Sequence, residues 1–163
     1  LVVFEKEVGL RNFTDRGTPI NGLVSESLLL SIFHPTSPLH DGAVILSRKG
    51  DLVAAKCILP VSMNQNLSTM LGTRHRAALG LTEETDAVVL IVSEERKEIS
   101  LGFQGQLIRE SQVDLKQMLF SLLSGKTTSI KTKKSPAEED ILLDDSLSIG
   151  RTEESSPNSA ATS

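Results

Sequence analysis

The stretch AVILSRKGDLVAAKCIL, residues 43–59, holds two apolar runs that are separated by a short polar segment. Each run has the length and the content of β-branched and small apolar residues that are typical of a strand. The polar segment 48–51 contains a glycine and links the two runs as a turn links paired strands. We therefore predict a β-hairpin here, with Cys57 as a small buried apolar residue of its second strand.

Strand patterns and helix patterns alternate on both sides of this hairpin. Ser25 is a suitable N-cap for a helix that Pro35 ends, and Ser111 and Asp114 form a capping box that opens a later helix, with Gly125 as its stop. The other strand-like runs are 1–8, 86–93, 98–104 and 105–110, and the helical runs are 25–33, 72–81 and 112–125. Strands that are interleaved with helices predict an α/β domain, and the hairpins predict a mixed sheet.

Length and composition limit the organisation and the partners of the chain. A chain of 163 residues with 39% hydrophobic content is long enough for one ordinary domain and too short for two. The net charge of -4 argues against nucleic acid as a partner, because duplex binding usually relies on a basic surface. Any anion-binding site must therefore be local.

The composition changes after Gly125. Residues 126–163 contain no aromatic residue, are rich in serine and threonine, and alternate short basic and acidic clusters. Such a composition buries too little surface to offset the loss of conformational entropy. We predict a folded domain at 1–125 and a disordered tail at 126–163. The segment DILLDDSLSIG, residues 140–150, is the alternative, as a docking segment for a regulatory protein.

Neither a disulfide nor a membrane span is expected within this sequence. Cys57 is the single cysteine, so no intrachain disulfide can form. No run of 18 apolar residues and no charged-then-apolar leader is present. The sequence starts at Leu1 inside an expected strand, and we interpret it as a fragment whose upstream part is missing.

A first polar cluster stands directly before the hairpin, where His40, Asp41 and Gly42 follow a proline-containing loop. An Asp-Gly pair beside alternating apolar residues is a common hairpin turn. The better turn lies at 48–51, however, so this pair is expected at the start of a strand. A local cap and a packed histidine remain the structural alternative.

A second cluster, LGTRHRAALG at residues 71–80, places cations at the start of an expected helix. With Thr73 as N-cap, Arg74, His75 and Arg76 occupy the first turn, where the positive end of the helix dipole disfavours them. A bound anion removes this conflict, because helix N-terminal N–H groups and arginines bind phosphate and Gly72 permits close approach. The alternative is surface pairing with Glu83 or Glu84.

The third cluster comprises Ser93, Glu94 and Glu95, which follow an apolar strand. Ligands of α/β sheets usually bind at the carboxyl ends of strands, although a charged turn is an ordinary alternative. Together the clusters offer carboxylates and an imidazole for a divalent cation, and Thr73, Arg74 and Arg76 for phosphate. This combination is typical of metal-assisted phosphoryl transfer.

The four stretches LHDGAVI, CILPVS, LGTRHRAALG and VSEE, in this order and spacing, resemble the diadenylate cyclase family. The family's catalytic domain makes cyclic di-AMP from two ATP. The resemblance runs from about residue 1 to 124, and the flanking sequence is most similar to the membrane-associated bacterial type. It implies an α/β domain with a mixed central sheet and helices on both sides.

The resemblance also implies a role for each matching position. Asp41 would promote attack by the ribose 3′-hydroxyl, and Gly42 would allow close backbone approach. The other implied roles are metal binding by His40, Asp41 and Glu95, triphosphate binding by Thr73, Arg74, His75, Ser93 and Glu94, and adenine binding by Ile58 and Leu59. Gly72 is a further expected ATP-binding residue, and Gly42, Arg74, His75 and Arg76 are expected to be catalytic together with Asp41. The related type often carries an aromatic residue in place of Ile58, and the turn at 48–51 holds one extra residue.

Cofactor and assembly follow from the same resemblance. Oxygen and imidazole ligands suit Mn²⁺, Mg²⁺ or Co²⁺. Because one site cannot hold both ATP molecules, two protomers must meet face to face in a homodimer. The resemblance further implies a cytoplasmic catalytic domain that is tethered to the membrane only through the missing N-terminal region.

Two other functions fit the same residues. The first is a regulatory module that binds ATP without catalysis, although such a module would not need Asp41, Arg74, His75, Arg76 and Glu95 together. The second is a metal-dependent phosphohydrolase that uses water as the nucleophile. The reaction product separates all three functions.

Overall fold

The structure is a computed structural model, and it describes residues 1–64, 71–93, 97–109 and 111–125. Its contacts divide the chain into the units Leu1–Ile130 and Lys131–Ser163. All described residues belong to the first unit, so the expected tail at 126–163, with its segment 140–150, lies outside the described residues. The elements are β1 (Val2–Phe4), α1 (Arg11–Thr14), β2 (Thr18–Leu23), α2 (Glu26–Ile32), β3 (Ala43–Leu46), β4 (Asp51–Cys57), α3 (Thr73–Glu84), β5 (Val88–Val92), β6 (Ile99–Phe103), β7 (Gln106–Ile108) and α4 (Gln112–Leu123).

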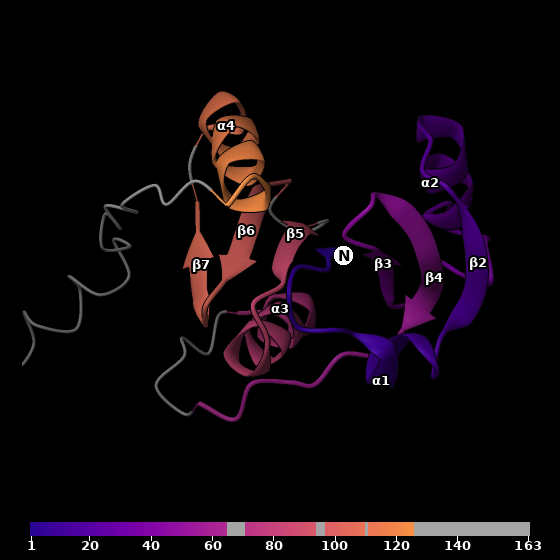
Figure 1. Cartoon of the computed structure of the whole chain (residues 1–163), viewed down its shortest axis with the longest axis horizontal. Helices are drawn as coiled ribbons and strands as arrows, with labels where there is room; N and C mark the ends of the chain where they lie inside the picture. Colours follow the sequence, from indigo (N-terminus) through magenta and orange to yellow (C-terminus); the bar gives the residue numbers. More distant parts are fainter. Residues whose placement is uncertain (65–70, 94–96, 110, 126–163) are drawn as a thin grey trace, which may run out of the picture. The chain divides into compact units, whose positions relative to one another are not determined.

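A seven-stranded sheet forms the centre of the first unit, with the strand order β2-β4-β3-β1-β5-β6-β7 (Figure 1). β1 pairs with β3 in parallel, and the other strand pairs are antiparallel. The predicted mixed sheet is confirmed, and so is the predicted hairpin, which β3 and β4 form. Its turn is closed by a hydrogen bond from Gly50 N to Ser47 O of 2.8 Å.

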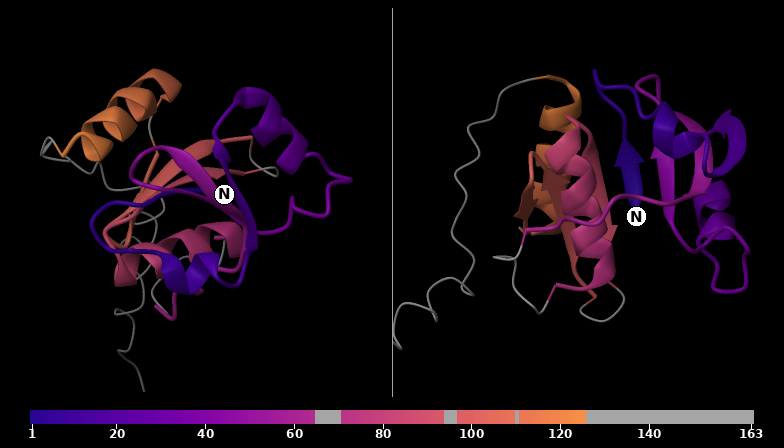
Figure 2. Two further views of the ribbon diagram at one scale, coloured as in Figure 1. Left: turned by 45° about the vertical axis from the view of Figure 1, so that its right-hand side comes forward. Right: turned by 90° about the horizontal axis from the view of Figure 1, so that it is seen from below.

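Helices cover both faces of the sheet. Alternate residues of β1 point to opposite faces, with Val3 in the core under α1 and α3 and Val2 in the core under α2. α4 packs on the same face as α2, over β5 and β6, through Leu115 and Leu122. Figure 2 (left view) shows α3 and α4 on opposite sides of the strands. The expected architecture, with helices on both sides, is therefore confirmed.

Helix boundaries follow local sequence signals at two of the longer helices. Ser25 caps α2 by accepting a hydrogen bond from Leu28 N at 3.2 Å, and Ser111 caps α4 by accepting one from Asp114 N at 3.3 Å. After α4, Gly125 adopts a φ of 68°, a left-handed conformation that commonly follows a helix end. These caps agree with the predicted ones.

The start of α3 differs from the prediction. The N-cap is Gly72 rather than Thr73, because the carbonyl of Gly72 already accepts hydrogen bonds from His75 N at 3.1 Å and Arg76 N at 3.2 Å. Within the described residues, no side chain caps this end of the helix. Arg74 and His75 therefore stay in the first turn, and each lies one position further into the helix than expected.

Candidate active site

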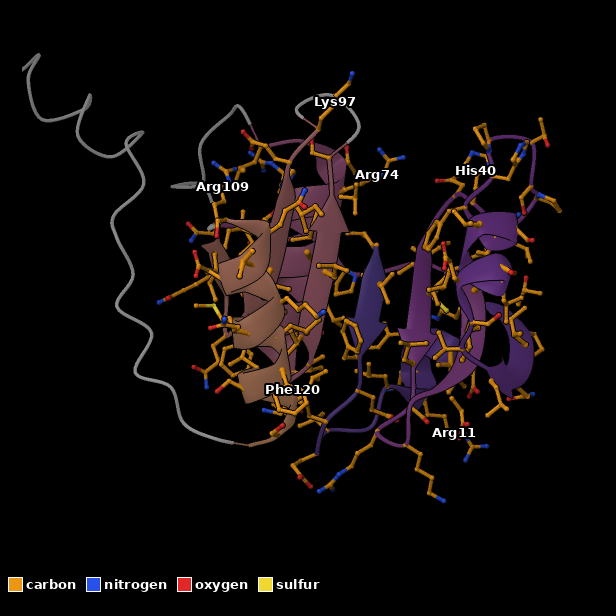
Figure 3. The ribbon with its side chains drawn as sticks, turned by 90° about the horizontal axis from the view of Figure 1, so that it is seen from above. Arg11, His40, Arg74, Lys97, Arg109 and Phe120 are labelled. Carbon is orange, nitrogen blue, oxygen red and sulfur yellow. The ribbon has the colours of Figure 1, made fainter. Side chains whose placement is uncertain are left out.

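The sheet topology brings the described residues of the three polar clusters to one edge. Ala43 at the start of β3 pairs with Cys57 at the end of β4. Val2 at the start of β1 pairs with Leu90, the middle residue of β5, so the end of β5 extends past the start of β1. β1 and β3 run in parallel, so both starts and both ends meet at the same edge. His40, Arg74 and Lys97, which come from three separate segments, lie at this end of the ribbon in Figure 3. We call it the β3 edge, after the strand that begins there.

Asp41 and Gly42 join the loop after α2 to β3. Gly42 has a φ of 125°, and a Cβ on it would lie 2.9 Å from the carbonyl carbon of Lys56. Only glycine allows the two backbones to approach this closely. The predicted close backbone approach at Gly42 is therefore present, and the backbone that approaches Gly42 is that of β4. Asp41 is exposed, and its carboxylate makes no hydrogen bond or ion pair with any described residue.

One of the two ring nitrogens of His40 is hydrogen-bonded within the protein. Its Nδ1 lies 2.6 Å from the carbonyl oxygen of Ser37, which can only accept a hydrogen bond. In the neutral imidazole Nδ1 therefore carries the proton and Nε2 keeps its lone pair, as is usual for a metal-binding histidine. The imidazole and the neighbouring Asp41 carboxylate fit a divalent cation, but no cluster of three ligating side chains occurs within the described residues. Glu95, the third expected ligand, lies outside them.

The start of α3 presents an open surface. Gly72, Thr73 and Arg74 are exposed, and no atom of the described residues would lie within 4 Å of a Cβ added at Gly72. The alternative pairing of the arginines with Glu83 or Glu84 does not occur, since neither pairing is found in the part of the chain that the structure describes. Glu83 instead accepts a hydrogen bond from the Ser62 hydroxyl at 2.7 Å.

His75 differs from its neighbours in burial. Its residue is 7% exposed, whereas Arg74 is exposed and Arg76 is half-buried. Of these three residues, Arg74 is thus the one that is most accessible to a ligand. The contact role expected for His75 stays a prediction, and its burial agrees better with orienting the helix start.

The two residues expected at the adenine have different environments. Leu59 is 7% exposed and belongs to the core cluster with Ala78 and Leu81, whereas Ile58 is 73% exposed. The segment after them is fixed to α3, because Ser62 N donates to the Arg76 carbonyl at 3.0 Å. Ile58 is therefore the accessible apolar surface at this point of the β3 edge, and Leu59 supports it from the core.

The third cluster is described only in part. Ser93 follows β5 directly, is 9% exposed, and donates its backbone N–H to Glu98 O at 2.9 Å. This places it at the β3 edge, where the sequence predicts it. Glu94 and Glu95 lie outside the described residues, so their expected roles stay predictions.

Cys57 takes no chemical part at this edge. Its side chain is buried, and desolvation by burial raises the pKa of the Cys57 thiol to about 11. The nucleophilic thiolate is therefore absent at neutral pH. The prediction of a buried, unreactive strand residue is confirmed.

A cavity of about 700 Å³ lies along α2, lined by Val24, Leu29, Leu30 and Phe33 among others, and none of the expected site residues lines it.

Sequence reasoning did not select Lys56, whose charge interrupts the apolar run LVAAKCIL and which reaches the surface at the β3 edge. That interruption was the available signal.

Comparison with known proteins gives consistent matches. The family described as DisA bacterial checkpoint controller nucleotide-binding, the DAC family, matches residues 1–107. The cyclic di-AMP synthase CdaA of Bacillus subtilis is 45% identical over 120 residues, which are 73% of this chain and 44% of that protein. A diadenylate cyclase of Listeria monocytogenes is 42% identical over 124 residues, which are 76% of this chain and 45% of that protein.

Solved structures agree with these sequence matches. DacA from Staphylococcus aureus, crystallised as a double mutant, superposes with a TM-score of 0.69 at 42% identity, over 74% of this chain and 79% of that one. A hypothetical membrane spanning protein from Bacillus cereus gives a TM-score of 0.64 at 42% identity, over 68% of this chain and 53% of that one. In the described part of the present chain, no helix is long and apolar enough to cross a membrane.

The sequence matches cover only part of each curated relative. The chain spans less than half the length of the curated relatives compared above. The family match nevertheless covers β1 to β6 and the start of α3 in one continuous segment. This chain belongs to the DAC family, described as DisA bacterial checkpoint controller nucleotide-binding.

Proposed function

We propose that this chain is a diadenylate cyclase, a nucleotidyltransferase that condenses two ATP into cyclic di-AMP and releases two pyrophosphates. The single observation that supports it most is the convergence of Asp41, Arg74 and Ser93 on the β3 edge of a DAC-family domain. Relatives named diadenylate cyclase or cyclic di-AMP synthase are 42% and 45% identical to it.

The reaction requires two equivalent nucleotidyl transfers. In each, the 3′-oxygen of one ATP forms a bond to the α-phosphorus of the other, and the bond from that phosphorus to the bridging oxygen breaks. The electron pair leaves with pyrophosphate, and the 3′-hydroxyl loses its proton. Asp41, an exposed carboxylate with no partner among the described residues, promotes this proton loss. Arg74 and the start of α3 hold the phosphates.

A divalent cation of the Mn²⁺, Mg²⁺ or Co²⁺ class is part of the proposal. Its residues are His40 through Nε2, Asp41 and the expected Glu95. When bound, the ion supplies positive charge that stabilises the anionic 3′-oxygen and the transferring phosphate. The hydrogen bond between His40 Nδ1 and Ser37 O supports this assignment, because it orients the ring and leaves Nε2 available.

Two protomers act together in the proposed mechanism. Because the β3 edge of one protomer presents one set of site residues, a second edge must deliver the second ATP. The attacking oxygen must come within about 3–3.5 Å of the phosphorus, which requires the two edges to face each other. We propose a homodimer with two-fold symmetry, at least during catalysis. In the whole protein, we further propose a membrane tether outside this sequence and a cytoplasmic catalytic domain.

Product analysis tests the function directly. The full chain is incubated with ATP and Mn²⁺, and the products are separated by anion-exchange chromatography and identified by mass spectrometry. We expect cyclic di-AMP and pyrophosphate in a ratio of one to two, loss of both with EDTA, and recovery when Mn²⁺ is restored. ADP or AMP as the product indicates a phosphohydrolase. Unchanged ATP together with measurable ATP binding indicates a silent regulatory module.

A further inference from the structure

Lys56 adopts an unusual backbone conformation near the end of β4. Its φ is 55°, in the left-handed region that non-glycine residues avoid. Two residues of β4, Ala55 and Lys56, lie opposite Val44 alone, which defines a β-bulge. Bulges and strained backbone positions are frequent beside active sites, where they redirect a side chain. Lys56 is exposed between Ala55 and Cys57, which are both buried.

The bulge places Lys56 directly against the Asp41 segment. A Cβ on Gly42 would lie 3.0 Å from the Lys56 Cα, so the two backbones are in contact. Asp41 immediately precedes Gly42 in the sequence. An acidic residue just before β3 and a basic residue of β4 thus lie close together at the β3 edge.

These two opposite charges are not paired. Neither the Lys56 ammonium nor the Asp41 carboxylate makes a hydrogen bond or ion pair with any residue that the structure describes. A ligand that carries both a divalent cation and phosphate oxygens satisfies both groups. The carboxylate then contacts the cation, and the ammonium contacts a phosphate oxygen.

The strand order defines where Lys56 lies relative to Arg74. Lys56 belongs to β4, Asp41 precedes β3, and Arg74 starts the helix that packs on β5 and β6. Since β3 lies between β4 and β5 in the sheet, Lys56 and Arg74 stand on either side of Asp41. Figure 3 shows the side chains of Arg74 and His40 at this end of the sheet. A polyphosphate at Asp41 therefore meets cations from both directions.

We propose that Lys56 binds a phosphate oxygen of ATP at the β3 edge, on the side of Asp41 away from α3. This assignment rests on the proposed function, and it adds a nucleotide-binding residue that sets ATP affinity. A lysine acts here as a point charge, so an arginine retains most of the effect and a neutral residue does not.

Three variants of the full chain test the assignment. Lys56→Asn removes the charge with a residue that tolerates left-handed φ, and Lys56→Arg keeps the charge. Lys49→Asn is the matched control, because Lys49 is exposed in the turn at the other end of the same hairpin. The measurements are the Kd for ATP with Mn²⁺, the KM and kcat for cyclic di-AMP synthesis, and the melting temperature.

We expect Lys56→Asn to weaken ATP binding and to raise KM by about tenfold, which is typical for the loss of a hydrogen bond to a charged group. Lys56→Arg should stay within about threefold of the wild type because its charge remains. Lys49→Asn should match the wild type in Kd, KM and kcat. The melting temperature should be unchanged in all three.

The outcomes separate this proposal from the proposed function. Wild-type Kd and KM in Lys56→Asn overturn the role of Lys56 even if cyclic di-AMP is made. Equal losses in Lys56→Asn and Lys56→Arg together with a lower melting temperature indicate a structural role and also overturn it. A wild-type chain that binds ATP without forming product refutes the cyclase, while the Kd comparison still decides Lys56. A wild-type chain that does not bind ATP refutes both.

Discussion

Asp41 lies next to a glycine that cannot be replaced without moving β4. The close contact between Gly42 and Lys56 fixes the backbone before β3, while the Asp41 side chain remains exposed. A rigid backbone with an accessible carboxylate is the arrangement that positioned acid–base chemistry requires.

Replacing Asp41 with asparagine should therefore separate binding from chemistry. The Asp41→Asn variant keeps the size of the side chain and removes its charge. We expect cyclic di-AMP formation to fall by about 100-fold or more, the usual contribution of a positioned acid or base. ATP affinity, measured by equilibrium binding, should change little. Asp51→Asn, at the other end of the same hairpin, is the control, and near-wild-type synthesis by Asp41→Asn contradicts the assignment.

Asp86 has a structural role away from the β3 edge. Burial alone raises the pKa of the Asp86 carboxyl, but the hydrogen bonds donated by Val8 N and Glu7 N, with the charge of Lys6, outweigh it and lower the pKa below its usual value. A lowered pKa in the folded state stabilises the fold above the unfolded-state pKa. That stability is lost as the pH falls through the folded-state pKa.

Asp86→Asn should therefore destabilise the fold in a pH-dependent way. At pH 7 we expect a loss of about 1 kcal/mol in the free energy of unfolding, because one neutral oxygen replaces two charged acceptors. The difference from the wild type should shrink as the pH falls below the unfolded-state pKa of about 4 and through the lowered folded-state pKa, where the wild-type carboxyl also becomes protonated. Urea unfolding at several pH values measures it. A difference that is constant from pH 3 to pH 7 is the result that excludes this explanation.

At the level of elements, α3 packs closely against the loop that contains Pro60 and Ser62, because Gly80 of α3 has no side chain. A Cβ on Gly80 would lie 2.4 Å from the Pro60 carbonyl oxygen and 2.7 Å from Ser62 N. Ser62 N also donates to the Arg76 carbonyl, so the loop and the helix touch through backbone atoms. The position of the loop that carries Ile58 thus depends on the small residue at Gly80.

Gly80→Ala tests this packing because two effects predict opposite signs. Helix propensity alone predicts stabilisation of up to about 1 kcal/mol for alanine over glycine. Overpacking against backbone atoms, which cannot move aside easily, predicts a loss of about 1–3 kcal/mol or more. We expect the loss to dominate in urea unfolding. Gly9→Ala is the control, since the nearest atom to its added Cβ lies at 3.9 Å. A more stable Gly80→Ala would refute the close approach.

At the level of the whole molecule, the proposed chemistry depends on protein concentration. One β3 edge provides one set of site residues, and cyclic di-AMP synthesis consumes two ATP that must face each other. Specific activity at saturating ATP should therefore fall as the protein is diluted through the dissociation constant of the dimer. Activity assays and sedimentation velocity over the same dilution series measure both quantities. Constant specific activity in a range where only monomer sediments argues against the homodimer.

Sequence patterns predicted most of the regular elements but not β2 and α1. β2 contains a proline, a glycine and Asn21 with a φ of 51°, a composition that is typical of a turn. It is nevertheless a strand, because β4 pairs with both of its ends, on either side of an irregularity between Pro19 and Gly22. α1 has only four residues, too few for a periodic signal. The N-cap at Gly72 was missed because threonine is the better capping residue by type.

Local sequence patterns were sufficient to predict the α/β class, the β3–β4 hairpin, the caps at Ser25 and Ser111 and the family, because these depend on periodicity, turn chemistry and motif residues that are local in the chain. The arrangement of the strands, in contrast, was needed to see that the starts of β1 and β3 and the ends of β4 and β5 share one edge. It also decided that His75 and Leu59 are buried while Arg74, Ile58 and Lys56 are exposed. The physical reason is that burial and proximity come from strand order and backbone packing between distant segments, which no local pattern encodes.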